Sequence, residues 1–448
     1  MDRSVLALPP HLRRLLEDSS KPQPREPRRS TIRLPPNLQK LKQSCLSVQQ
    51  QSEEGEYDIL SLIQYLSDFP RDANFLDMGN ILDAWMEIGG RGRTYEVRRY
   101  SEDTDWHNHW RDSRAFKFLR ISVNDNESSN SFRYKSLIQE VRILRHPALS
   151  MHPNMVRVNG IAWHPHGDGL NIYLPALVTE YSALGTVDKV LSSWRIPYMN
   201  QKRRLILDVA EGLSALHSCS LVHGDVKSEN VLVFLCEDPT YPFVAKLTDF
   251  GFSVDISNRE DSHDHLIGYT PLWAAPEATE RLKYSAMPST DIYSSGFVIW
   301  AIAHDGQTLF DSLQHLPEDP HARVQAFNGL KKSDQLLTIV HQELFEEGNS
   351  GRVEIYSEIL NFLHDTLQST PSGRTLRNII NHLRQVCPRA NEKTFLKELQ
   401  TSPLSAFDHQ KVRQSFMLAF VYARYFFVPI WSCSKVHSWL NSVLIMVD

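Results

Sequence analysis

The stretch from His223 to Gly251 constrains this chain of 448 residues more than any other part of it. Two short apolar runs, VLVF and FVAKL, are separated by a break that contains proline, so the stretch predicts two paired strands. Asp225 lies ahead of the first strand and is followed by a lysine and an amide, Lys227 and Asn230. A second carboxylate, Asp249, falls at the end of the second strand.

This constellation resembles the catalytic and metal-binding loops of the eukaryotic protein kinases, whose pattern is H-R-D-x-x-x-x-N followed by D-F-G. The chain departs from the pattern at Gly224, where the family usually has arginine. A lone DFG tripeptide would be a weak signal, whereas the joint spacing is specific. The positions that match are His223, Asp225, Asn230, Asp249, Phe250 and Gly251.

The resemblance assigns these side chains to phosphoryl transfer, in which the protein mainly positions the reactants and neutralises phosphate charge. Asp225 would orient the substrate hydroxyl or accept its proton, and Lys227 would neutralise charge on the group in transit. Asn230 and Asp249 would hold Mg²⁺, which prefers oxygen ligands.

Matches to the nucleotide-binding part of a kinase lie upstream. IGGRGRTYEV resembles the glycine-rich loop, with Tyr95 in place of its third glycine. Lys117, in the predicted strand 114–121, would bind phosphates, and it needs a partner because a buried unpaired ammonium is costly. Glu140, in the helical pattern that follows, would be that partner. The resemblance places ATP against Gly90, Gly92, Val97, Ala115, Lys117, Thr179 and Leu232, and against backbone groups of Glu180 and Ser182.

The segment that ends in TPLWAAPE resembles the substrate-docking end of serine/threonine kinases. Thr270 would contact Asp225 and Lys227. Tyrosine kinases usually have alanine or arginine at the position of Lys227, and they lack this threonine. The resemblance also predicts that Asp291 anchors the catalytic-loop backbone and that Arg374 pairs with Glu277.

Glycine at position 224 has a regulatory consequence. By the same resemblance, the activation segment is the stretch that follows Gly251 and is bounded by Glu277. In kinases with arginine at the position of Gly224, the guanidinium forms charge-assisted hydrogen bonds with a phosphate on that segment. Glycine cannot do so, and activity is therefore not expected to depend on phosphorylation of Ser253, Ser257 or Ser262.

The resemblance implies an α+β, bilobal protein-kinase fold over residues 79–386. A small antiparallel sheet with one key helix would occupy 79–179, and a larger helical lobe 183–386, with ATP between the lobes. The amphipathic run 203–218 would be a helix that leads into the catalytic loop. Residues 1–56, rich in proline and charge, are expected to be disordered. Residues 57–78 would form a flanking helix, and residues 387–448 a tail.

Composition supports an ordinary globular protein, with 41% hydrophobic and 23% charged residues. The net charge of −5 is mild and argues neither for nor against a nucleic-acid partner. A protein kinase acts on protein, so we expect no nucleic-acid partner. Five scattered cysteines without a CxxC pair indicate a reducing compartment, so we expect a cytoplasmic protein.

The tail contains the apolar segment 416–431, which is interrupted by Arg424 and Pro429. A membrane-spanning helix needs about 20 apolar residues. We therefore expect a helix docked on the large lobe, with an interfacial membrane helix as the second choice. The third alternative is that the extreme C-terminus is an unselected translated sequence.

The function predicted is that of a serine/threonine protein kinase, which transfers the γ-phosphate of ATP to a protein substrate. HGDVK with a WAAPE-like ending also resembles divergent fungal kinases. The alternative is a pseudokinase that serves as a nucleotide-binding or scaffold module, since a fold does not imply a function. Tyr95, Gly224 and the atypical loop insertions favour the alternative. A membrane-associated receptor module, a different class of protein, finds support only in the tail. The retention of Lys117, Glu140, Asp225, Asn230 and Asp249 argues for the enzyme.

Overall fold

The computed structural model describes Leu62 and most of residues 86–388. Within that range it leaves out 92–94, 101–113, 120–126, 166–172, 194–195, 197, 237, 239, 258–261, 314–315, 334 and 349–352. The predicted N-terminal region 1–56, the predicted flanking helix 57–78 apart from Leu62, and the tail beyond residue 388 lie outside the described residues.

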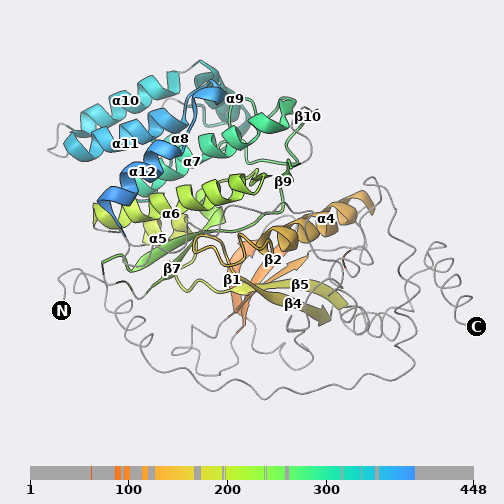
Figure 1. Ribbon diagram of the computed structural model, residues 1–448. Coiled ribbons are helices and arrows are strands. Elements are labelled where there is room, and N and C mark those ends of the chain that lie inside the picture. Colours follow the sequence, from red (N-terminus) through yellow and green to blue (C-terminus); the bar gives the residue numbers. More distant parts are fainter. Residues whose placement is uncertain are drawn as a thin grey trace, which may run out of the picture. The chain divides into compact units, whose positions relative to one another are not determined.

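The chain divides into two compact units. The described part of the first holds a five-stranded sheet in the order β1-β2-β3-β5-β4 (Figure 1). The pairs β1–β2, β2–β3 and β3–β5 are antiparallel. The strands are β1 (Met86–Arg91), β2 (Tyr95–Tyr100), β3 (Arg114–Leu119), β4 (Val158–Pro165) and β5 (Tyr173–Glu180).

Strand β3 shows how the sheet buries one face. Phe116 and Phe118 are buried, and the intervening Lys117 is partly exposed, because successive side chains of a strand point to opposite faces. The two phenylalanine rings stack with centroids 6.3 Å apart. They belong to a small apolar core that also contains Ala162, Ala176 and Val178.

Helix α4 (Glu127–Leu144) contributes residues to both units. The second unit is mainly helical: α5 (Val187–Ser193), α6 (Met199–Ser218), α7 (Pro288–Ala303), α8 (Leu309–Ser312), α9 (Pro320–Lys332), α10 (Gln335–Gly348), α11 (Val353–Thr366) and α12 (Arg377–Val386). The predicted helix 203–218 is present as α6 and begins four residues earlier. The predicted α+β architecture, a small antiparallel sheet and a larger helical part, is confirmed.

The core of the second unit forms around α6 and α7, which pack against each other (Figure 1). Helix α7 begins with Pro288, a residue favoured in the first helical turn because it has no N–H that needs a partner there. It is buried along nearly its whole length. Helix α11 packs on α7, and α12 packs on α6.

The strands of the second unit form three two-stranded sheets. The pairs are β6 (Leu221–Val222) with β9 (Val254–Asp255), β7 (Val231–Leu235) with β8 (Phe243–Leu247), and β10 (His263–Asp264) with β11 (Leu282–Lys283). The hairpin predicted from VLVF and FVAKL is therefore present as β7 and β8.

Helix α6 fixes the position of this hairpin. Asp208, fully buried, accepts a hydrogen bond from the backbone N–H of Ala245 in β8 at 2.9 Å and another from Arg204 at 2.9 Å. Gly212 allows the close approach, since a β-carbon there would lie 3.0 Å from the side chain of Leu247. The end of the hairpin that carries the predicted site is thereby held against α6.

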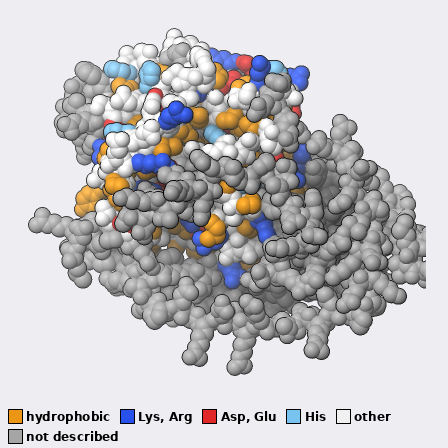
Figure 2. Space-filling model, viewed as in Figure 1, with side chains coloured by type: hydrophobic (Ala, Val, Ile, Leu, Met, Phe, Trp, Pro, Cys, Tyr) orange, Lys and Arg blue, Asp and Glu red, His pale blue; other side chains and the backbone are white. Residues whose placement is uncertain are grey.

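The surface of the described part is mixed. Figure 2 shows hydrophobic side chains interspersed with basic and histidine side chains on one face. Within the residues that the structure describes, no helix has the length and apolar character needed to cross a membrane. The apolar segment 416–431 lies outside those residues, so both predictions for the tail remain predictions.

Candidate active site

The two predicted metal ligands lie at the open end of the β7–β8 hairpin. The strands pair with Val231 opposite Leu247, which places Asn230 and Thr248 just beyond the pair. The backbone N–H of Thr248 donates to the carbonyl oxygen of Asn230 at 3.0 Å. Asp249 follows directly and has a positive φ of 63°, a conformation that turns the chain sharply out of the strand.

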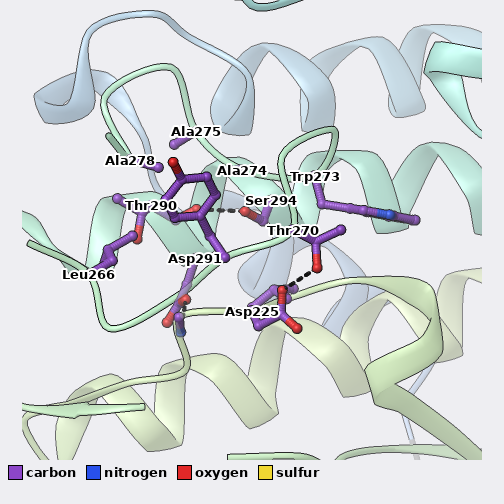
Figure 3. A pocket seen from close by; sticks show the side chains of 13 residues that line it. Asp225, Leu266, Thr270, Trp273, Ala274, Ala275, Ala278, Thr290, Asp291 and Ser294 are labelled. Carbon is purple, nitrogen blue, oxygen red and sulfur yellow. Dashed lines mark hydrogen bonds between the residues drawn. The ribbon is translucent and has the colours of Figure 1, made fainter. Parts of the chain in front are cut away.

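Asp225 lies in a closed triangle of hydrogen bonds with Lys227 and Thr270. One carboxylate oxygen accepts from the hydroxyl of Thr270 at 2.6 Å, and the other accepts from the ammonium of Lys227 at 2.6 Å. The ammonium also donates to the Thr270 hydroxyl at 2.8 Å. Figure 3 shows Thr270 pointing toward Asp225. Thr270 therefore makes both of the contacts that the sequence predicted.

Asn230 is oriented by the same carboxylate. Its amide nitrogen donates to the backbone carbonyl of Asp225 at 2.8 Å and to the side-chain oxygen at 3.1 Å. These bonds identify the nitrogen end of the amide, so the oxygen end points the other way. An amide oxygen and a carboxylate, Asn230 and Asp249, are a donor set that suits a hard divalent cation.

The metal would need further ligands. Across the described part of the chain, no three His, Cys, Asp or Glu side chains form a ready-made cluster. Two protein ligands fit a cation that is shared with phosphate oxygens.

His223 is a structural member of the loop. Its Nδ1 accepts from the backbone N–H of Asp225 at 3.3 Å, and its Nε2 lies 3.1 Å from the carbonyl oxygen of Thr248. A carbonyl can only accept, so the proton is on Nε2. The ring also packs on Phe250, with centroids 5.0 Å apart. One histidine thus joins the loop that carries Asp225 to the strand end that carries Asp249.

Asp291, in the first turn of α7, holds the backbone of the loop that carries Asp225. Its carboxylate accepts from the backbone N–H groups of His223 at 2.7 Å and Gly224 at 2.9 Å, as predicted. His217, at the end of α6, lies 2.9 Å from the same carboxylate. The sequence analysis missed His217, although its position just ahead of LVHGD was a signal that could have found it.

Gly224 is required by the close approach of Phe252. Its φ is +82°, and a β-carbon there would lie 2.6 Å from the carbonyl oxygen of Phe252. The ring of Phe252 lies against a second glycine, Gly268, where a β-carbon would come within 2.5 Å of the ring. Phe252 therefore packs against two positions without side chains, a contact that the sequence did not reveal.

The activation segment is fixed by further pairs. Strands β6 and β9 pair at its start, and the hydroxyl of Ser253 donates to the carbonyl of His223 at 3.0 Å. Ser253 is 1% exposed. The hydroxyl of Ser253 is therefore buried and already hydrogen-bonded, which agrees with the expectation that activity does not depend on its phosphorylation. For Ser257 and Ser262 the expectation remains a prediction.

At the other end of the segment, Arg374 pairs with Glu277 through two hydrogen bonds of 2.5 and 3.0 Å, as predicted.

A small cavity of about 10 Å³ lies beside Asp225, in the region drawn in Figure 3. Its walls come from the catalytic loop, the segment 266–278 and the first turns of α7. This volume is enough for a single water molecule.

The predicted nucleotide residues of the first unit align across the sheet. Gly90 pairs with Val97, and Val97 pairs with Lys117. In the neighbouring row Ala115 pairs with Thr179. Directly opposed residues, and residues two apart in one strand, share a face. These five positions therefore lie on one face of the sheet, opposite to Phe116 and Phe118.

The remaining predicted residues belong elsewhere. Gly92 lies outside the described residues, and Glu180 ends β5. Glu140 is buried in α4. Ser182 is buried, and its hydroxyl accepts from the backbone N–H of Gly185 at 3.0 Å. Leu232 lies in β7. Glu140 and Lys117 fall in different units, so their pairing remains a prediction, as do the catalytic and ligand-binding roles of all these residues.

The family model of the protein kinase domain matches residues 90–383, which is more than half of the chain. A probable serine/threonine-protein kinase of Dictyostelium discoideum is 31% identical over 193 residues, 43% of this chain and 11% of the relative. The tyrosine-protein kinase csk-1 of Caenorhabditis elegans is 30% identical over 211 residues, 46% of this chain and 35% of the relative.

The serine/threonine-protein kinase ULK3 of Rattus norvegicus is 28% identical over 253 residues, 56% of this chain and 49% of the relative. In each case the matched part spans less than half of the relative's length.

Protein kinase domains use ATP with a divalent metal ion. The predicted domain boundaries and the resemblance to fungal kinases remain predictions. The extent of the domain match establishes that this chain belongs to the protein kinase family.

Proposed function

We propose that the protein is an active kinase that transfers the γ-phosphate of ATP to serine or threonine hydroxyls of a protein substrate. The observation that carries the proposal is the triangle of Asp225, Lys227 and Thr270. It places a carboxylate, a cation and a hydroxyl within hydrogen-bond reach of one another, ready to receive an acceptor hydroxyl and the charge that develops on a phosphoryl group.

In this mechanism Asp225 orients the acceptor hydroxyl and takes its proton. Lys227 stabilises negative charge at the oxygen in transit, and Thr270 fixes both side chains. Asn230 and Asp249 would hold the divalent ion, which we propose is Mg²⁺, and the ion would neutralise phosphate charge. Lys117 would contact the phosphates, and Val97, Ala115 and Thr179 would face the base from the same side of the sheet.

The choice of serine and threonine over tyrosine rests on Lys227 and Thr270, since the relatives include kinases of both classes. We expect the purified, phosphatase-treated full chain to form phosphoserine or phosphothreonine, and no phosphotyrosine, on a generic basic protein. Phosphotyrosine as the main product would overturn the assignment.

Metal-dependent nucleotide binding, measured together with phosphoryl transfer, separates an enzyme from a scaffold. Asn230 and Asp249 reach the nucleotide through the ion, so ATP should raise the melting temperature more with Mg²⁺ than with EDTA. A ligand at a hundredfold excess over its Kd contributes about 2.7 kcal/mol to the folded state. Asp249→Asn should remove the difference. Metal-dependent binding without any transfer would establish the pseudokinase alternative.

Two further expectations remain predictions. The three described cysteines, Cys219, Cys236 and Cys387, are free thiols, which supports the cytoplasmic location proposed from the sequence. We propose a protein as substrate and no nucleic-acid partner.

A further inference from the structure

Lys331, near the end of α9, is a buried lysine that is 1% exposed. Its ammonium donates three hydrogen bonds, to the carbonyl oxygens of Pro271 at 3.2 Å, Leu272 at 2.9 Å and Ala274 at 2.7 Å. An ammonium has three protons, so these bonds satisfy all of them. Burying a cation is costly unless it is compensated, and here the compensation comes from backbone carbonyls of a single loop.

Aromatic rings complete the surroundings of this ammonium. It lies 4.7 Å from the centroid of the Phe327 ring and 5.3 Å from that of Phe297. Both distances are within the range of a cation–π interaction. The ring of Trp273, which belongs to the same loop, meets the Phe297 ring edge-on with centroids 6.4 Å apart. Lys331 is therefore built into the contact between this loop, α7 and α9.

The loop 271–274 is tied to the proposed catalytic centre at its other end. The backbone N–H groups of Trp273 and Ala274 both donate to the carbonyl of Thr270 at 3.0 Å. The side chain of Thr270 in turn contacts Asp225 and Lys227. The ammonium of Lys331 is thus connected to the carboxylate of Asp225 by hydrogen bonds that pass through the backbone of Ala274 and through Thr270.

We propose that Lys331 is a positioning residue for phosphoryl transfer, which holds the loop 271–274, and through it Thr270, by the three hydrogen bonds of its ammonium. The proposal rests on the proposed kinase activity. Backbone carbonyls that face inward need donors, and one point of attachment with three donors fixes both the position and the orientation of the loop. A displacement of about 1 Å in such a support can cost about 100-fold in rate.

The charge on Lys331 provides a readout of its own. Burial lowers the pKa of Lys331 to about 7, against the opposing effect of the Glu277 carboxylate. Glu277 is itself held by Arg374, and the neighbouring Lys332 faces Glu280 at 3.7 Å. A neutral amine has two N–H groups and a lone pair, so it cannot satisfy three carbonyls. The loop should loosen as the pH rises through this range.

The test compares Lys331→Met with Lys332→Met in the full chain. Methionine keeps the apolar stem and removes the three donors, and Lys332 is an exposed neighbour on the same helix. For Lys331→Met we expect kcat/KM for a protein or peptide substrate to fall about 10- to 100-fold, with an unchanged KM for ATP. Lys332→Met should behave as the wild type. Equal kcat/KM in the two variants would overturn the proposal.

The conservative variant Lys331→Arg gives a second test, since arginine stays charged at all accessible pH values. Wild-type kcat/KM for substrate should decline on the alkaline side, and this decline should be absent in Lys331→Arg. The same alkaline decline in both would contradict the role of the Lys331 charge.

Hydrogen exchange distinguishes failure of this proposal from failure of the proposed function. The amides of Trp273 and Ala274 in the wild type should lose protection as the pH rises through about 7, after correction for intrinsic exchange. This measurement needs neither activity nor a folded Lys331→Met variant. Unchanged protection would refute the proposal that the Lys331 ammonium holds the loop 271–274. If protection changes as expected but the protein transfers no phosphate, Lys331 does hold the loop 271–274, and its proposed role in catalysis is refuted.

Discussion

The carboxylate of Asp291 accepts the backbone N–H of His223 at 2.7 Å. It also accepts the backbone N–H of Gly224 at 2.9 Å. Because Asp291 lies in the first turn of α7, these two bonds attach the loop that carries Asp225 to the central helix of its unit. Asp291→Asn keeps the size but turns an NH₂ group toward one of these donors. We expect a loss of about 1–3 kcal/mol in unfolding free energy, the cost of one unsatisfied buried donor.

The two effects of Asp291→Asn can be separated by measurement. Chemical denaturation gives the stability change, and kcat measured well below the melting temperature gives the change in the folded enzyme. Unchanged values in both would show that the loop holds its shape without this carboxylate.

Asp225→Asn tests the proposed base. The amide keeps an acceptor for Thr270 or Lys227 but cannot take a proton, so kcat should fall about 10²–10⁴-fold. The affinity for ATP, measured by calorimetry, should remain. Turnover equal to that of the wild type would remove Asp225 from the mechanism.

The two glycines beside Phe252 should not tolerate alanine. Gly224→Ala combines a positive φ with a contact to backbone and should cost about 1–3 kcal/mol. Gly268→Ala meets the Phe252 ring and should also destabilise the protein. A β-carbon at Gly329, inside α9, would have no atom within 4 Å, so Gly329→Ala should stabilise by up to about 1 kcal/mol. Melting curves of the three variants provide the comparison, and a uniform response would contradict the steric explanation.

Activity should not require phosphorylation of the activation segment. Ser257 and Ser262 are the candidates to replace, since Ser253 is buried and donates to His223. The variant Ser257→Ala/Ser262→Ala should retain most of the wild-type kcat/KM after phosphatase treatment of both proteins. A tenfold or greater loss would indicate that a phosphate on this segment is needed.

His152 should make stability depend on pH in the acid range. Burial, and secondarily the positive charge of Arg384, lowers the pKa of His152 from 6.5 to about 4. Between these values the unfolded chain binds the proton and the folded chain does not, so stability rises with pH across this window and is lost as the pH falls. The contribution is at most about 3 kcal/mol.

Replacement by a side chain that does not titrate tests the assignment. In His152→Asn, stability between pH 4 and pH 6.5 should vary less with pH than in the wild type. Denaturation curves across this range measure the slope, and parallel curves for the two proteins would show that other groups are responsible.

The local parts of the site could be predicted from the sequence. Asn230 and Asp249 flank two short strands that the runs VLVF and FVAKL already indicate in the sequence, so hairpin pairing brings these two residues together, and Asp225 lies only five residues ahead of Asn230. The shared face of Val97, Ala115 and Lys117 follows from the two-residue period of a strand, once the register is known.

The long-range parts could not be predicted. Lys331 meets carbonyl groups 57 to 60 residues away along the chain, and its sequence context, LKKS, resembles the solvated end of any surface helix. The burial of Ser253 depends on the pairing of β6 with β9, two strands of two residues each, which are too short to leave a pattern. Tertiary packing decides such positions, and local preference does not.

The close contact between Gly224 and Phe252 bears on how this kinase could change over time. A glycine codon becomes an arginine codon by a single base substitution, so the family's usual residue at position 224 is always within mutational reach. Such a mutant would still not gain control by phosphorylation, because the new side chain would collide with the carbonyl of Phe252 before it could reach any phosphate. Gaining that control would therefore require the arginine together with a second change that moves the backbone of Phe252.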